Sequence, residues 1–527
     1  MSGNAHNPWL HRFAVFAVAC TFVLITMGGL VTSREAGLTV PDWPTSFGYN
    51  MFLLPFDQWL GKFGILEEHA HRLMASLVGL FTAGIAIWMW ARESVGRTRT
   101  IAITGVLVTL GLMGVRTQTM FVVMAVAASL MAAFSVIKII SNRSALRWWA
   151  TLAYSMVIVQ GVLGGLRVTQ LKDQIGVLHG TLAQIFLIVL TCIALFSSRW
   201  WKESKAAKTV ESLVPRVVRS HFFYATLLIF LQLILGATIR HQHAGLPVWD
   251  FPRAHGQWWP STEESMLAKY NADRSALQNQ LHANKQTLDP SGNPTTFLTT
   301  GKDIQASHIS LHMFHRVTAL LILGLVLGTA ILTHRKLGGG HMLSKLSLLW
   351  LGLVLVQATL GILTVLKYKP ADIATLHVLV GAATLLTGAM GTVISRSRDL
   401  PACFEAVEEE WKNKLSAARY KEASLEEECD NILTNDRIRY CDNIHVLIRD
   451  PAQRFQSGLN QYCKVYHDLD VLETFDKVKK GELIDRHFSP QWTWLLHLYK
   501  YYKGKVCLRD FDNLKDYTDI HVNPTTH

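Results

Sequence analysis

Long runs of apolar residues, separated by short polar segments, occupy most of the first 400 positions of the chain. A helix needs about 20 residues to cross a bilayer, and ten runs approach that length. They lie near 11–31, 71–91, 100–115, 119–140, 148–168, 176–198, 219–240, 308–334, 345–366 and 374–395. The pattern predicts an all-α polytopic membrane protein. No small-residue cleavage site follows the first run, so we interpret it as a retained span and not as a signal peptide.

Composition and charge fit this prediction. Half of the 527 residues are hydrophobic and 17% are charged. The basic residues cluster in alternate loops, near 92–99, 138–147, 199–219, 335–336 and 396–398. By the positive-inside rule these loops are cytoplasmic, as are both termini. The net charge of +12 then reflects topology and contact with anionic lipid, and requires no nucleic acid. We expect an integral protein of a bacterial-type plasma membrane.

The apolar runs carry one layout twice. The first copy reads AGLTVPDWP (36–44), EHAHR (68–72), QGVLGG (160–165) and then His179. The second reads AGLPVWDFP (244–252), HMFHR (312–316), QATLG (357–361) and then His377. The repeat predicts two related four-helix bundles, in residues 1–210 and 211–399. The first contains an extra helical hairpin at about 100–140, and the second an external loop at 241–307.

A histidine recurs near the start of four of the runs, at His71, His179, His315 and His377. In the predicted topology each of these runs passes from outside to inside, so the four histidines lie at similar depth. Ionisable groups in apolar spans are costly and need partners. Facing helices of a bundle can present histidines in pairs as axial ligands of a haem. The repeat pairs His71 with His179 and His315 with His377, which gives one haem-sized site in each half.

A lone histidine at a membrane helix end is more often a residue that reaches for the interface. We interpret the histidines outside the matched set in that way, or as partners of the ligands. They are His69, His308 and His312.

Taken together, these residues resemble the haem A synthase family. The similarity extends over about residues 10–396 and includes the run GGLVTSREAGLTVPDWP (28–44) and QGVLGGLRV (160–168). In that family two four-helix bundles oxidise the C8 methyl of haem O to the formyl group of haem A, which cytochrome oxidases need.

The resemblance also implies roles for the four histidines. His71 and His179 would flank the substrate haem O. His315 and His377 would ligate a haem b that passes electrons or acts as a structural and redox partner. A haem O synthase would supply the substrate, while the electron donor stays open.

The resemblance makes Glu68 the catalytic carboxylate. The repeat supports an asymmetry here, because the position that matches Glu68 is His312. A carboxyl group beside a porphyrin can hold or relay a proton, as stepwise oxygen insertion and dehydration of a gem-diol require. An acid in the first turn of a helix can also simply complement the helix dipole.

Three arginines lie near the outer ends of the same helices, where haem propionates would point. They are Arg72, Arg167 and Arg316. Arginine suits bidentate binding of carboxylates, although arginine is also common at membrane interfaces without such a role.

The chain departs from the family in its hairpin at about 100–140 and in its cysteines. Some members carry a cysteine pair in an external loop, whereas Cys20 and Cys192 lie within apolar runs. We therefore expect no disulfide-gated step.

Residues 400–527 differ in character from the rest, with dense charges of both signs and no apolar run. The stretch HVLIRDPAQRFQSGL (445–459) resembles the later part of a sulfotransferase domain, in which Arg449 and Ser457 would hold the nucleotide 3′-phosphate. The upstream phosphate loop of that domain has no match. We expect a small, cytoplasmic α/β-like fragment without sulfonyl transfer, in which such arginines can equally be solvated surface charges.

A second function remains open at this point. A di-haem b membrane protein that only transfers electrons would use the same four histidines. An acid such as Glu68 beside one haem favours the enzyme, because pure electron carriers usually keep both haems six-coordinate with no acid nearby.

Overall fold

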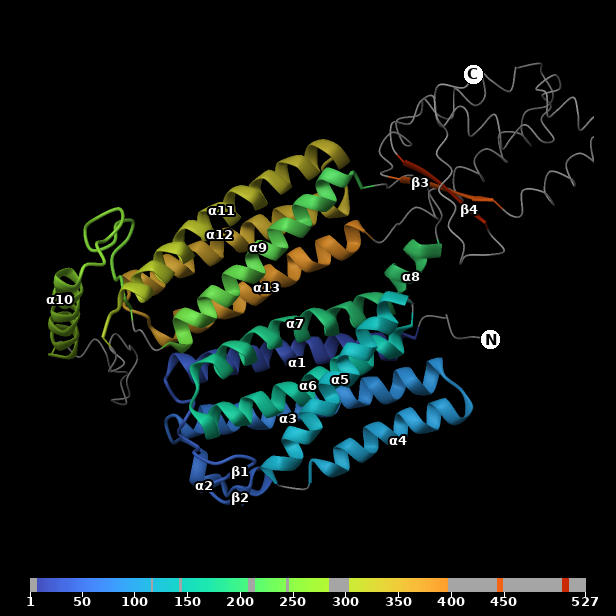
Figure 1. Ribbon diagram of the computed structural model, residues 1–527, viewed down its shortest axis with the longest axis horizontal. Coiled ribbons are helices and arrows are strands. Elements are labelled where there is room, and N and C mark those ends of the chain that lie inside the picture. The colour runs from blue at the N-terminus through green and yellow to red at the C-terminus, as the bar shows by residue number, and fades with distance from the viewer. Residues whose placement is uncertain are drawn as a thin grey trace, which may run out of the picture. The chain divides into compact units, whose positions relative to one another are not determined.

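The computed structural model describes residues 7–114, 117–141, 145–206, 214–242, 246–283, 303–396, 443–448 and 505–510. Most of these residues are helical (Figure 1). The predicted domain boundaries near 210 and 400 lie outside the described residues.

The membrane-spanning character of the chain is confirmed. Nine helices in the described residues are long and apolar enough to cross a bilayer. They are α1 (Pro8–Ser33), α3 (Ile65–Glu93), α5 (Gln118–Ser141), α6 (Leu146–Gln170), α7 (Asp173–Ser197), α9 (Arg216–His241), α11 (Ala306–Leu337), α12 (Met342–Leu366) and α13 (Ala371–Ser395). The chain is therefore an all-α integral membrane protein.

The run near 100–115 forms a shorter helix than the other nine. Helix α4 (Gly96–Leu112) has 17 residues and carries Arg97 and Arg99 in its first turn, so its apolar part falls short of the roughly 20 residues of a full span. It joins α5 to form the expected hairpin, with α4 packed on α3 and α5 packed on α6.

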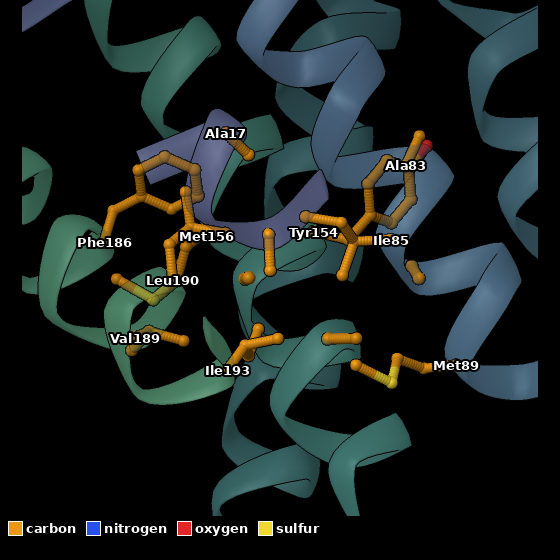
Figure 2. Packing of buried hydrophobic residues seen from close by; sticks show 14 of the residues in the cluster. Ala17, Ala83, Ile85, Met89, Tyr154, Met156, Phe186, Val189, Leu190 and Ile193 are labelled. Carbon is orange, nitrogen blue, oxygen red and sulfur yellow. The ribbon is translucent and has the colours of Figure 1, made fainter. Parts of the chain in front are cut away.

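The first half consists of α1 and α3–α7. Helices α1, α3, α6 and α7 each contact two others of this set and enclose a core that reaches from Leu10 to Ala194 (Figure 2). Polar contacts fix the helix ends. The Glu93 carboxylate at the end of α3 accepts hydrogen bonds from the backbone N–H groups of Leu146 (3.2 Å) and Arg147 (2.9 Å), which caps the start of α6.

The second half consists of α9, α11, α12 and α13 (Figure 1). Phe222 of α9 stacks on Trp350 of α12 with ring centroids 5.5 Å apart, and both side chains are fully buried. Helix α13 approaches these rings through glycines. A Cβ on Gly388 would lie 2.4 Å from Trp350 Cζ2, and one on Gly391 would lie 2.4 Å from the Phe222 ring.

The two halves meet through α1 and α7 on one side and α9 and α13 on the other. Ile25, Leu187 and Ala382 form a small apolar cluster there. Thr375 Oγ1 donates to Ser33 Oγ at 3.0 Å, and the Arg240 guanidinium donates to Gly29 O and Ser33 Oγ.

The loop after the first helix of each half has the same construction. Asp42 accepts hydrogen bonds from the N–H groups of Phe47 (2.6 Å) and Gly48 (2.9 Å), and Asp250 does the same for His255 (2.7 Å) and Gly256 (2.9 Å). Burial would raise the pKa of Asp42, but hydrogen bonds from Thr45, Gly48 and Phe47 outweigh it and lower that pKa. The repeat thus extends from the helices to their loops.

Two shorter parts complete these loops. In the first half, β1 (Thr45–Ser46) pairs antiparallel with β2 (Tyr49–Asn50), followed by a 3-10 turn (Met51–Leu53) and α2 (Phe56–Trp59). In the second, α10 (Glu264–Ala283) packs through Tyr270 on the ring of His255, with centroids 3.7 Å apart. Helix α8 (Arg199–Ala206) follows α7.

The C-terminal unit shows one strand pair among its described residues. β3 (Asn443–Ile448) runs parallel to β4 (Lys505–Asp510), with His445 opposite Cys507. Arg449 and Ser457 of the sulfotransferase-like stretch lie outside the described residues.

The close approach of α13 to Trp350 gives a test of the fold. We expect Gly388→Leu to lower the free energy of unfolding by about 3 kcal/mol, because the new side chain must displace a fully buried indole. Thermal unfolding of the purified protein in detergent measures this change.

Gly352→Leu is the matched control on α12, because a Cβ there meets no atom within 4 Å. Equal unfolding temperatures for the two variants would contradict the packing described here.

Candidate functional site

A large cavity, lined by described residues, runs through the helices of both halves. Its volume is about 1580 Å³, above the range of roughly 300–1,000 Å³ that holds one ordinary small ligand. All four predicted histidines line it: His71, His179, His315 and His377. The cavity is thus large enough for more than one bulky, mainly apolar ligand.

Each of these histidines lies against a glycine of a neighbouring helix. A Cβ on the glycine would come within 2.9–3.4 Å of the imidazole Cε1. The pairs are Gly28 with His71, Gly164 with His179, Gly236 with His315, and Gly361 with His377. The missing side chain lets the Cε1 edge of each imidazole approach the next helix, so the same local packing occurs four times.

Three of the four histidines also contact a glutamine one turn before that glycine. Gln160 Nε2 donates to His179 O at 2.7 Å, and Gln232 Nε2 donates to His315 O at 2.8 Å. Gln357 Nε2 lies 3.3 Å from His377 Nε2. The matching residue for His71 is Leu24, so this histidine lacks the polar contact.

The histidines fit the axial ligands of a haem. Within each half the two imidazoles interact electrostatically, His71 with His179 and His315 with His377. The Nδ1 atoms of His71, His315 and His377 are buried and have no hydrogen-bond partner among the described residues. Buried polar atoms are usually paired, so these imidazoles suit a site in which an iron or a ligand completes their bonding.

Glu68 lies at the cavity wall and is buried. Its Oε1 accepts from Arg72 Nη2 at 2.7 Å, and its Oε2 accepts from Val40 N at 2.9 Å and from Thr39 Oγ1 at 3.1 Å. These donors fix the orientation of the carboxylate. The position is one turn before His71, so the acid and the candidate ligand face the same space.

Arg72 holds the loop that precedes its helix. Besides Glu68, its terminal nitrogens donate to the carbonyl oxygens of Asp42 (2.7 Å), Val40 (2.8 Å) and Thr45 (3.1 Å). In the second half, Arg316 donates to the carbonyls of Asp250 (2.8 Å) and Arg253 (3.0 Å). Both arginines line the cavity, but these hydrogen bonds engage their guanidinium groups with backbone.

Arg167 differs from the other two predicted arginines. Its guanidinium lies against Gly37 at the cavity wall and is attracted by Glu68 and Asp173. No hydrogen bond to another described residue holds it. Of the three arginines it is therefore the one whose N–H groups are available to an anionic ligand.

Two of the three histidines outside the matched set have local partners. His69 Nδ1 lies 3.4 Å from Ser46 Oγ, with its ring 4.8 Å from that of Trp59. His308 Nδ1 accepts from Gln305 N at 3.3 Å at the start of α11. His312 lines the cavity at the place that Glu68 occupies in the first half, and its Nδ1 is buried without a hydrogen bond.

Several cavity residues escaped the sequence analysis. Gln232 and Gly236 have the same spacing as Gln160 and Gly164, and this spacing could have identified them. Two cations at the junction of the halves, Arg240 and Lys369, also line the cavity. Lys369 Nζ lies 4.0 Å from Glu35, and burial lowers the pKa of Lys369 and raises that of Glu35.

Comparison with known proteins agrees with this arrangement. The sequence profile of a family described as cytochrome oxidase assembly protein matches residues 116–390. Several relatives named haem A synthase align at low identity. That of Halalkalibacterium halodurans is 23% identical over 361 residues, which are 68% of this chain and 87% of the relative. That of Shewanella oneidensis is 23% identical over 397 residues, which are 72% of this chain and 93% of the relative. That of Shouchella clausii is 22% identical over 272 residues, which are 51% of this chain and 71% of the relative. The matches do not bear on the sulfotransferase-like stretch, which stays a prediction.

The glutamine contacts predict a difference in how tightly the histidines are held. We expect Gln232→Leu to weaken retention of a haem in the second half by about fivefold, because it removes one neutral hydrogen bond, worth about 1 kcal/mol, to the backbone carbonyl of His315. Transfer of haem from the purified protein to apomyoglobin measures this loss.

Leu24→Gln is the matched control, since it introduces the glutamine that the first half lacks. It should not accelerate haem transfer. If Gln232→Leu transfers haem at the rate of the unmodified protein, the glutamine has no orienting role.

Proposed function

The chain belongs to the family of cytochrome oxidase assembly proteins, and on this basis we propose that it is a haem A synthase. It oxidises the C8 methyl group of haem O to a formyl group through hydroxylated intermediates, giving haem A for cytochrome oxidase. The observation that carries the proposal is the cavity itself. Two matched pairs of histidines line it, and only the first pair has a carboxylate beside it.

In this proposal the two halves bind different haems. His71 and His179 flank the substrate haem O, and His315 and His377 ligate a resident haem b, which supplies redox chemistry when bound. One difference accompanies this division. Leu24 occupies the position that matches the glutamines in contact with the other three histidines.

Glu68 acts on protons at the methyl carbon of the substrate. Two hydroxylations at this carbon give a gem-diol, which loses water to form the aldehyde. The Glu68 carboxylate accepts the proton of one hydroxyl group as the carbonyl forms and returns it to the other hydroxyl group, which leaves as water. Arg72, Thr39 and Val40 hold the carboxylate in place, so that it need not reorient during the step.

The arginines divide between positioning and binding. Arg72 and Arg316 support the loops that carry Asp42 and Asp250. Arg167 has N–H groups free to bind a propionate of the substrate bidentately. The position that matches it in the second half is Thr364, so a propionate of haem b would find its cation elsewhere, at Arg240 or Lys369.

The topology follows from charge. We infer that both termini are cytoplasmic and that the four histidines lie in the outer half of the membrane, because the basic residues occupy alternate loops. A haem O synthase in the same membrane would supply the substrate.

The direct test is chromatography and mass spectrometry of the haems extracted after expression beside a haem O synthase. We expect haem b together with haem A or its hydroxylated intermediate. Haem b alone, with haem O present in the membrane and unchanged, would instead favour a di-haem electron carrier.

Substitution of the carboxylate tests its role. We expect Glu68→Gln to reduce haem A formation by on the order of 100-fold or more, because general acid–base groups contribute that much, while the resident haem b stays bound. Glu67→Gln is the matched control, since Glu67 pairs with Arg34 and caps α3 without lining the cavity. Normal haem A levels in the Glu68 variant would remove the catalytic assignment.

The resident haem has its own test. His315→Ala and His377→Ala should each deplete haem b from the purified protein, measured as the haem-to-protein ratio. Full haem b content in either variant would show that the second pair does not ligate it.

A further inference from the structure

The extra hairpin contributes a wall to the cavity of the first half. Five residues of α4, α5 and the turn between them line the cavity: Leu110, Met113, Gly114, Phe121 and Met124. Residues of α6 face the same space, namely Tyr154, Val157, Ile158, Gly161 and Val162. Apart from the Tyr154 hydroxyl, these side chains are apolar. The Tyr154 hydroxyl is satisfied by Thr109 Oγ1 of α4 at 2.7 Å.

The hairpin is firmly attached to the first half. Val106, Met124 and Ala128 belong to its buried core. Phe121 packs on Trp43 with ring centroids 4.7 Å apart, and Trp43 in turn lies over Gly165, where a Cβ would meet its ring at 2.1 Å. Trp43 follows Asp42 in the loop that Arg72 holds, so the hairpin and the Glu68 site share one wall.

The first half is also roomier than the second at matched positions of the cavity. Gly79, Gly161 and Gly180 line the first half, and a Cβ on any of them would meet no atom within 4 Å. The second half has Leu323, Ala358 and Val378 at the corresponding places, all of which line the cavity. The second half has no hairpin between α11 and α12.

We propose that this space between the α4–α5 hairpin and α6 binds the isoprenoid chain of haem O, and so makes the first half selective for haem O over haem b. The inference rests on the proposed function. Haem O differs from haem b by a hydroxyethylfarnesyl group in place of one vinyl group. An apolar space that is lined by glycines and continuous with the His71–His179 site suits that chain. The larger side chains at the matched positions of the second half suit a porphyrin without it.

This space between the hairpin and α6, called the channel from here on, also explains how one methyl group of the porphyrin is chosen. A porphyrin held only by its iron can rotate about the axis through its ligands. A long side chain anchored in one channel restricts that rotation, so the same edge of the ring faces Glu68 in each turnover.

The test compares the affinities of haem O and protohaem for the first half. Purified full-length protein with its resident haem is titrated with each porphyrin, and binding is followed in the Soret band. We expect the unmodified protein to prefer haem O by at least about tenfold, because even one methylene in an apolar pocket discriminates by that factor. Leu110→Trp, which fills the channel, should reduce the preference to less than about threefold while protohaem still binds.

Leu107→Trp is the matched control, since Leu107 is on the same helix, 53% exposed and outside the cavity. It should keep the preference of the unmodified protein. If Leu110→Trp keeps it as well, or if it weakens both porphyrins equally while the resident haem remains, the channel does not hold the chain.

A second variant keeps the test decisive if Leu110→Trp misfolds. Loss of the resident haem would reveal such misfolding. Gly161→Leu narrows the channel from α6, with Gly352→Leu on α12 as its control. Gly161→Leu should lose the preference for haem O, and an unchanged preference would overturn the proposal.

The unmodified protein distinguishes a failure of the proposed function from a failure of the channel. Failure to bind haem O or to form haem A would contradict the proposed function, whereas haem A formation with an unchanged preference in both channel variants would contradict the channel alone.

Discussion

Four imidazoles that line the cavity of an apolar helical bundle are the constraint on which the rest of this structure depends. Each needs a polar partner inside the membrane, where water is scarce and unpaired groups are costly. The bundle meets this need only in part. A glycine on the next helix admits each ring, and in three cases a glutamine one turn away contacts the histidine, twice at its backbone carbonyl. The Nδ1 atoms of His71, His315 and His377 have no hydrogen-bond partner among the described residues, and all four histidines line the cavity. Iron ligation then follows as the way to complete their bonding.

The halves share this framework and differ in what surrounds it. Where the first half has Glu68, Leu24, Arg167 and Gly161, the second has His312, Gln232, Thr364 and Ala358. The first set provides an acid, an available cation and open space beside a histidine without a glutamine contact. The second set provides a glutamine that bonds the backbone carbonyl of its histidine, and a closer wall. Such differences fit one half that exchanges a substrate and another that retains a cofactor. The loops, in contrast, are nearly identical in construction, with Asp42 and Asp250 in the same turn and Arg72 and Arg316 on the same carbonyls.

Much of this could be predicted from the sequence, because apolar length and repeated motifs are local signals. The spans, the hairpin and the four histidines all follow from them. The roles of Arg72 and Arg316 could not be predicted. Their neighbours in the chain suggest propionate binding, but their hydrogen bonds go to loop carbonyls some 30 to 66 positions away. Gln232 was missed although its spacing to Gly236 repeats that of Gln160 to Gly164, since α9 carries none of the four matched histidines. The apolar part of α4 is short because Arg97 and Arg99 occupy its first turn. The periodicity of apolar residues alone does not show this effect of charge.

The central claim is that the two histidine pairs hold different porphyrins. Electron cryo-microscopy of the full-length protein, purified from cells that make haem O, tests it most directly. The account predicts a porphyrin between His71 and His179 with a long side chain running toward Leu110 and Met124, and a porphyrin without such a chain between His315 and His377. The same porphyrin in both halves, or a ring bound away from either histidine pair, would contradict it.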